Sequence, residues 1–338
     1  LSSTNEYNFR HIANASTLCT SLTAPFTMFN DPNFFWKNFR LGTELQISGT
    51  FIYNALYFFD KMENFYYEHE CFEFLYNVAV GIERLEKIAI VLLEHDDNGN
   101  QEDFEKSLIT HNHLELLSRI KKYKTINFGK THIKFLQLLS DFYRSTRYDR
   151  FGIASVFHPN QDKEQLIKFV STELKIEISA GMMFPTEIDD RIRKFIGKTV
   201  STISTKLYDI IDDRAHELNM YTYELDYSSK AFKVFVEKGY SFFEEKLFQK
   251  EILIYLLNKK DDDGILSFIK SLEPLEFESY DTSEYIKFLL DFHKRRLMLS
   301  ELTYLYEENK LGKQRLYEVD VIGADNVSFD IEEDDETQ

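Results

Sequence analysis

The sequence predicts an all-α protein, and three observations support this prediction. Glycine and proline are scarce in the 338-residue chain, with 12 and 5 copies, whereas phenylalanine and tyrosine number 31 and 20. Few turn-forming residues and many long side chains favour helices joined by short loops. Apolar residues recur every three or four positions, and no segment from residue 47 to 305 shows the sustained alternation that is typical of strands.

The first segment, 1–46, is only weakly periodic, and we expect it to form an arm that packs on the main body. Asp31 followed by Pro32 is typical of a helix N-cap with proline in the first turn. An aromatic face is expected on that short helix, formed by Phe34, Phe35, Trp36 and Phe39.

Four long helices are predicted in the segment 47–160. The first is expected over 47–69 and the second over 70–94, where one apolar stripe is formed by Phe74, Val78, Ile82, Leu85, Ala89 and Leu92. The other side of the second helix is expected to carry Glu83, Arg84, Glu86 and Lys87, with Glu83 and Lys87 as an i,i+4 ion pair. Thr110 is the expected N-cap of a third helix that reaches about Lys124, and the fourth is expected over 130–148.

A second helical region is predicted over 161–317. Its helices are expected at 161–179, from Thr186, at 199–214, at 229–245 and at 247–259, and a capping-box variant at 281–284 is expected to open a long helix through Leu302. From Glu318 the pattern changes to short apolar islands among acidic residues. The segment 318–338 is therefore interpreted as an acidic tail, either disordered or with a small edge strand.

The charge and the cysteine content restrict the partners and the compartment. The net charge of −17 repels phosphate at long range, which disfavours a general nucleic-acid coat or an anionic membrane surface but allows a local basic pocket. Cys19 and Cys71 are too few for a disulfide framework or a four-ligand zinc site. No apolar run is long enough to cross a bilayer, so we expect a cytoplasmic protein without a membrane partner.

Common catalytic motifs do not occur in the sequence. It contains no glycine-rich phosphate loop, no GxSxG, no HExxH and no paired CxxC. The loop at 94–105 matches some calcium-ligand offsets, but it begins with Glu94 and has Gln101 at a position that is normally apolar, so we interpret it as an Asn-Gly turn. His111 and His113 lie two residues apart, which on a helix directs them to different faces and argues against a shared metal.

Three arginines form the most informative group. Arg144, Arg147 and Arg150 are spaced by three and therefore drift slowly around one side of a helix. Because three cations in that position repel each other, carboxylates or an anion must face them. One interpretation is an ion network with Asp141 and Asp149, and the other is a phosphate-binding pocket.

The segment 81–87 (GIERLEK), in the second of two long helices, is followed after a loop by the segment 110–114 (THNHL), which opens a third helix. A fourth helix closes on Arg147 and Tyr148. In their order and spacing these elements resemble the helical HEPN family (higher eukaryotes and prokaryotes nucleotide-binding), over roughly residues 47–159. The resemblance implies a HEPN-like four-helix core, followed here by the second helical region and the acidic tail.

Many members of the HEPN family are metal-independent ribonucleases in phage-defence, toxin–antitoxin or RNA-processing systems, often as dimers. They use an arginine and a histidine separated by four to six residues. The resemblance therefore implies catalysis by Arg147, Arg150 and His158 and phosphate binding by Arg144, Arg147 and Arg150. The arginine stabilises charge at phosphorus, and the histidine transfers a proton to or from the 2′-hydroxyl.

This chain departs from the motif, because seven residues separate Arg150 from His158. Either the pocket is built more loosely, or catalysis has been lost. The first hypothesis is an RNA-directed effector with metal-independent endoribonuclease activity, no metal and no cofactor. The alternatives are a non-catalytic helical scaffold, which forms a homodimer or binds a protein partner, and an inhibitor whose acidic tail mimics nucleic acid.

Overall fold

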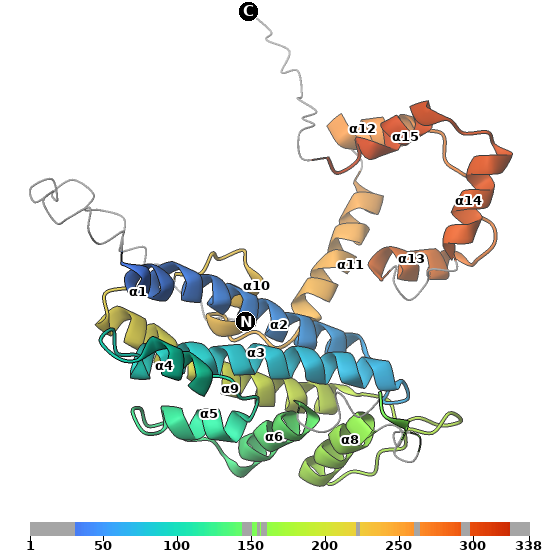
Figure 1. Cartoon of the computed structure of the whole chain (residues 1–338). Helices are drawn as coiled ribbons and strands as arrows, with labels where there is room; N and C mark the ends of the chain where they lie inside the picture. Colours follow the sequence, from blue (N-terminus) through green and yellow to red (C-terminus); the bar gives the residue numbers. More distant parts are fainter. Residues whose placement is uncertain are drawn as a thin grey trace, which may run out of the picture. The chain divides into compact units, whose positions relative to one another are not determined.

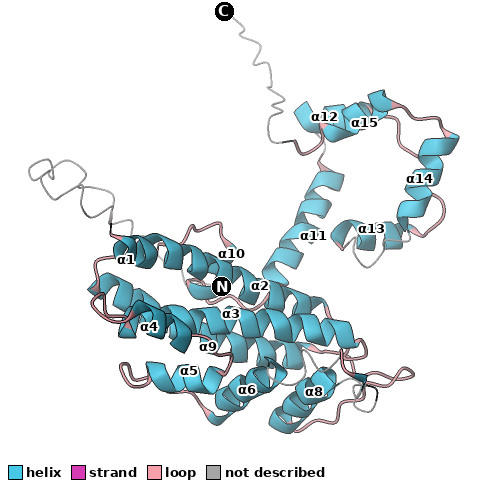
Figure 2. Ribbon diagram, viewed as in Figure 1, coloured by secondary structure: helices cyan, strands magenta, loops and turns pink. Residues whose placement is uncertain are grey.

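The computed structural model describes residues 31–143, 151–153, 156, 161–220, 224–259, 264–291 and 298–324. Within these ranges every regular element is a helix, and the β pairing consists of an isolated bridge between Asn64 and Glu187 (Figure 2). The predicted all-α class is therefore confirmed. The chain divides into two compact units, the first ending at Phe242 and the second beginning at Phe243.

Helix α3 (Glu68–Glu94) is the centre of the first unit. It contacts α2 (Leu41–Lys61), α5 (His113–Ile120), α6 (Lys130–Asp141), α8 (Gln161–Leu174) and α9 (Asp190–Glu217). Figure 1 shows α2 along one side of α3 and α5, α6 and α8 along another. All six residues of the predicted apolar stripe are buried. Because neighbours surround α3, it also buries residues outside that stripe, such as Cys71 and Leu75.

The helices that precede α3 begin earlier and end earlier than predicted. Asp31 caps α1 (Pro32–Phe35), as expected, by accepting the N–H of Asn33 at 2.9 Å. The chain continues through a π-helical turn, η2 (Trp36–Arg40), directly into α2. The prediction that this helix extends to residue 69 is wrong. Arg193 of α9 binds the carbonyls of Asp60 and Met62, at 3.2 and 2.8 Å, and a continuing helix would need both as acceptors.

Helix α9 is a single helix where two were predicted. Asp189 caps it through the N–H of Ile192 at 2.9 Å, whereas Thr186 forms hydrogen bonds with Ser179 in the preceding loop. Gly197 does not interrupt α9. It permits close packing instead, because a Cβ atom at this position would lie 2.7 Å from the ring of Tyr240.

Helix α10 (Lys230–Phe235) completes the first unit by packing against α2 and α9. Its contact with α2 is close: a Cβ atom on Gly49 would lie 2.4 Å from Cβ of Ala231. The helix is shorter than the predicted 229–245, because Lys238 has a left-handed backbone (φ 56°) and Gly239 bonds back to the carbonyl of Lys233 at 2.8 Å. The first unit therefore contains the predicted segment 47–160 together with α8, α9 and α10.

The loop after α3 forms the expected Asn-Gly turn. The N–H of Gly99 donates to the carbonyl of Asp96 at 2.9 Å. Glu94, which stands at the first of the calcium-ligand offsets considered above, binds Arg119, with Nη2 2.6 Å from Oε2. A short helix that was not predicted, α4 (Gln101–Ser107), follows the turn.

The second unit consists of α11 (Phe243–Asn258), α12 (Gly264–Ser271), α13 (Thr282–Leu290), α14 (Leu299–Glu308) and α15 (Lys313–Asp320). The predicted long helix from Asp281 through Leu302 is wrong, because Asp291 leaves the helical region with φ −156° and ψ 79°. Helix α15 extends to Asp320, two residues past the predicted start of the acidic tail at Glu318, and residues 325–338 lie outside the described ranges. None of the described helices is both long and apolar enough to cross a membrane.

Candidate functional site

All four residues predicted to form the site, Arg144, Arg147, Arg150 and His158, lie outside the described ranges, as does Asp149. Asp141 is described and accepts a hydrogen bond from Gln137 at 2.8 Å. The described chain reaches Tyr143, the residue that directly precedes Arg144. Tyr143 lines a cleft of about 300 Å³ in the first unit. One residue that lines this cleft is therefore the immediate sequence neighbour of the segment that carries the predicted arginines.

Two acid–base pairs supply the polar lining of this cleft. Lys87 Nζ lies 2.7 Å from Glu83 Oε1, which confirms the predicted i,i+4 pair. Arg84 Nη1 binds Glu44 of α2, and its guanidinium lies 5.7 Å from the ring centroid of Phe51. Since each cation already has a carboxylate partner, the described part of the cleft is close to neutral.

His111 lies beside the cleft and contacts two of its lining residues. Its Nδ1 is 2.8 Å from Glu83 Oε2, and its ring stacks on Tyr143 with centroids 4.1 Å apart. The histidine side chain is 47% exposed, whereas that of Glu83 is 11% exposed. The arrangement is a solvent-accessible imidazole that is oriented by a largely buried carboxylate and an aromatic ring.

The backbone around His111 differs from the prediction. Asn112, not Thr110, caps α5, because its Oδ1 accepts the N–H groups of Leu114 and Glu115 at 3.2 and 3.4 Å. Thr110 uses its hydroxyl to donate to Glu115 at 3.1 Å. The helix also ends at Ile120 rather than near Lys124. His111 therefore precedes α5, while His113 is its first residue.

A second histidine–carboxylate pair links the same two segments of the chain. His113 Nδ1 is 2.7 Å from Glu86 Oε2, and both side chains are completely buried. The backbone N–H of His113 donates to Ser140 of α6 at 3.0 Å. Burial raises the pKa of the Glu86 carboxyl, and the neighbouring His113 opposes that shift. The prediction that Glu83 and Glu86 lie away from the buried side of α3 is wrong, because α5 packs on this side of α3 as well.

The two pairs differ in what they can do chemically. Glu86 Oε1 and His113 Nε2 are buried and have no hydrogen-bond partner among the described residues. Because both side chains are completely buried, no external molecule can reach these atoms. The role of the pair is structural, since its contact joins α3 to α5. The His111–Glu83 pair is accessible and can exchange a proton with a bound molecule.

The described residues give less support to a metal site or to a cysteine nucleophile. Within them, no group of three or more His, Cys, Asp or Glu side chains is placed to hold a metal ion. Cys71 is buried in α3, and burial raises the pKa of its thiol to about 12, so it is not an activated nucleophile.

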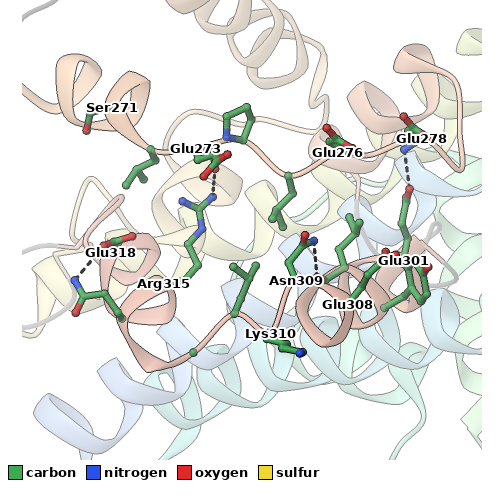
Figure 3. Close-up of a pocket in the computed structure, with 18 of the residues that line it drawn as sticks. Ser271, Glu273, Glu276, Glu278, Glu301, Glu308, Asn309, Lys310, Arg315 and Glu318 are labelled. Carbon is green, nitrogen blue, oxygen red and sulfur yellow. Dashed lines mark hydrogen bonds between the residues drawn. The ribbon is translucent and has the colours of Figure 1, made fainter.

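The second unit contains a larger cavity, of about 1150 Å³, between α12, α14 and α15 (Figure 3). Its wall carries several carboxylates, including those of Glu276, Glu301 and Glu308. Glu301 is the most buried of these three and accepts the N–H groups of Glu278 and Ser279 and the hydroxyl of Tyr285, at 2.8 to 3.0 Å. Its hydrogen bonds stabilise the loop that forms the wall, so the role visible at this carboxylate is structural.

Sequence reasoning found the segments 81–87 and 110–114 but not the pairing between them. The signal that was available is the i,i+3 spacing of Glu83 and Glu86, which places two carboxylates on one helix face opposite two histidines. Comparison of the chain with protein-family models, with curated proteins and with solved structures gives no match.

Proposed function

We propose that this chain is an RNA-directed effector of the HEPN type, in which Arg144, Arg147 and Arg150 bind a phosphate group and RNA is cleaved without a metal ion. The observation that supports this proposal is the cleft beside Tyr143, where the chain enters the arginine segment. The order of the segments 81–87, 110–114 and 144–150 in the sequence resembles that of the HEPN core, and the first two pair through Glu83 and His111 and through Glu86 and His113.

Electrostatics assign a clear role to the arginines in this proposal. The net charge of −17 repels RNA at long range, so affinity must come from local cations. Lys87 and Arg84 are neutralised by Glu83 and Glu44. The arginine segment supplies the additional positive charge, and guanidinium groups bind phosphate in a bidentate manner.

A non-catalytic interaction scaffold is the second candidate, and one observation favours it. Helix α11 buries none of its residues in the second unit, although it is rich in large apolar side chains. Phe243, Phe248 and Leu257 are each about two-thirds exposed or more, at 68, 66 and 73%. Apolar surface of this extent is typical of protein-binding regions.

Alanine substitution of Arg147 or Arg150 distinguishes the two candidates. In the effector, loss of either guanidinium should lower RNA cleavage by about 10²–10³-fold without lowering the melting temperature, because a phosphate-binding cation is not needed for folding. In a structural ion network the same substitutions should destabilise the protein by about 1–3 kcal/mol. The measurements are thermal melting and cleavage of random-sequence RNA in a chelator, on wild type, Arg147→Ala, Arg150→Ala and His158→Ala.

Lys198→Ala is the matched control, since it removes one exposed cation from α9 without affecting the cleft. It should leave both measurements unchanged. If wild type cuts no RNA and the arginine variants melt early, the scaffold replaces the effector.

A further inference from the structure

Helix α11 has an apolar stripe that extends over its whole length. Five positions along it are spaced alternately by four and three residues, which keeps them on one side of a helix with 3.6 residues per turn. This alternation is the heptad pattern by which two helices pack along each other. We call these five residues the α11 seam: Phe243, Leu247, Lys250, Ile254 and Leu257.

The opposite side of α11 is apolar only in its middle. Phe248, Ile252 and Tyr255 lie there, between the charged residues Glu245 and Lys259. The ammonium group of Lys259 also lies 5.8 Å from the ring centroid of Tyr255 and covers part of it. The seam is therefore the longer of the two apolar surfaces, and its single charge is that of Lys250.

The seam is exposed and requires a partner. Leu247 and Ile254 are 45 and 54% exposed, in addition to the still more exposed Phe243 and Leu257. Among the described helices of the second unit, none packs extensively along α11. Since the stability of a helix of 16 residues comes mostly from packing of its apolar face, α11 is expected to be covered by a further element.

The area of the seam fits a stable dimer. Its four apolar side chains expose the equivalent of more than two whole side chains, or roughly 400 Å² at about 150–200 Å² each. A protein interface of standard size buries about 800 Å² per partner, of which a little more than half is non-polar. The seam thus supplies nearly all of the apolar area that one partner contributes to such an interface.

The charges of α11 complement those of a second copy. In an antiparallel pair, Leu247 packs on the partner's Leu257. Lys250 then packs on the partner's Ile254, about 4.5 Å along the axis from the partner's Glu251, which its flexible side chain can reach. A parallel pair would instead place the two Lys250 ammonium groups opposite each other, where they repel.

We propose that the chain forms a homodimer in which two α11 helices pair in antiparallel orientation through the seam. The interface has two-fold symmetry, so each copy contributes the same residues. This inference rests on the scaffold candidate, whose partner it identifies, and not on RNA cleavage. Helix α11 also lies outside residues 47–159, so the resemblance described above does not contribute to it.

The mass of the whole chain in solution, measured by sedimentation velocity, tests the proposal. Wild type should have twice the chain mass of 40.2 kDa. Ile254→Lys should raise the dissociation constant of the dimer by about 100-fold or more, because it places a second ammonium group opposite the partner's Lys250. Phe248→Lys is the matched control, since it adds the same charge at an exposed position on the opposite side of α11. It should leave the dimer intact.

Exchange of charges gives a second test that does not depend on loss of association. Lys250→Glu and Glu251→Lys should each be monomeric alone, because four like charges then meet at the centre of the pair. An equimolar mixture of the two variants should restore the dimer, since one copy is acidic at the centre and the other is basic. Heterodimers in the mixture alone support the pairing of α11 with a second copy.

Disulfide formation tests the orientation. Leu247→Cys and Leu257→Cys are each placed in a Cys19→Ser background, and the remaining Cys71 is buried. A mixture of the two chains should form a disulfide between them, whereas neither variant should do so alone. Disulfides within each variant alone would show a parallel pair and contradict the proposed geometry.

A monomeric wild type at high micromolar concentration overturns this inference. It leaves the scaffold candidate with a different protein as partner, and it leaves the RNA-directed proposal to its own cleavage assay. Persistence of the dimer in Ile254→Lys, or its loss in Phe248→Lys, overturns the assignment of the interface to the seam.

Discussion

Replacing Glu86 with alanine is expected to destabilise the first unit by about 3–5 kcal/mol. Glu86 and His113 are both completely buried, and their contact of 2.7 Å joins α3 to α5. Alanine removes the hydrogen-bond acceptor of His113 Nδ1 and leaves an imidazole in an apolar interior without that partner. The measurement is urea unfolding followed by the fluorescence of Trp36, the single tryptophan, which lies in the first unit.

Glu86→Gln is the matched control for this variant. Its amide oxygen can still accept the hydrogen bond from His113, and no charge has to be buried. We expect its stability to lie within about 1 kcal/mol of wild type or above it. Equal stability of the alanine and glutamine variants would show that the pair contributes nothing to the joint between α3 and α5.

The raised pKa of Glu86 also predicts a pH dependence. Ionisation of a group whose pKa is higher in the folded state favours unfolding, so its contribution to stability is complete below the unfolded pKa and is lost as the pH rises through the folded pKa. The unfolded reference for this group is 4.5. Wild type should therefore lose stability relative to Glu86→Gln as the pH rises above about 4.5. A difference that is independent of pH would contradict the raised pKa.

Replacing Gly49 with valine is expected to destabilise the first unit by about 3 kcal/mol, at the upper end of the range for overpacked interiors. A Cβ atom on Gly49 would lie 2.4 Å from Cβ and 2.5 Å from Cα of Ala231. Because the second of these atoms belongs to the backbone of α10, the overlap cannot be relieved by a side-chain rotation. The two helices must separate, and the contacts between α2 and α10 weaken. The same fluorescence-monitored urea unfolding measures the effect.

Gly181→Val adds the same atoms at an open position and serves as the control. The nearest atom to a Cβ there is Ser179 Oγ at 3.8 Å, and the backbone is not left-handed. Its effect should stay within about 0.5 kcal/mol. If both valine variants unfold at the same urea concentration, α10 does not pack on α2 as closely as the structure shows.

The fold class and the central helix could be predicted from local patterns, whereas several helix ends could not. The stripe along α3 is predictable because its apolar spacing directly reflects burial. The end of α2 depends on Arg193, which lies more than a hundred residues away in the sequence. Gly197 lies within α9 at a point where the ring of Tyr240, distant in the sequence, leaves no room for a Cβ atom. Distant contacts of this kind leave no periodic signal in the segment that they shape.

The same limit applies to the candidate site. The segments around Glu83 and His111 can be selected from the sequence, but the prediction that His111 and His113 face different sides requires that one helix carries both. Asn112 begins α5, so the two histidines lie on either side of a cap and both reach α3. Asparagine is at least as good an N-cap as threonine, so the sequence itself favours Asn112 over Thr110 as the residue that begins α5.

The contact between Gly49 and Ala231 has a consequence for biosynthesis. Helix α10 leaves the ribosome about 180 residues after the part of α2 on which it packs. At translation rates of about 5–20 residues per second, α10 is synthesised roughly 10–40 seconds after the part of α2 on which it packs. During that interval one apolar face of α2 is uncovered on the nascent chain, where a chaperone can bind it. Chains that stop before residue 230 should therefore be prone to aggregation, even though they contain all of α2, α3, α5 and α6.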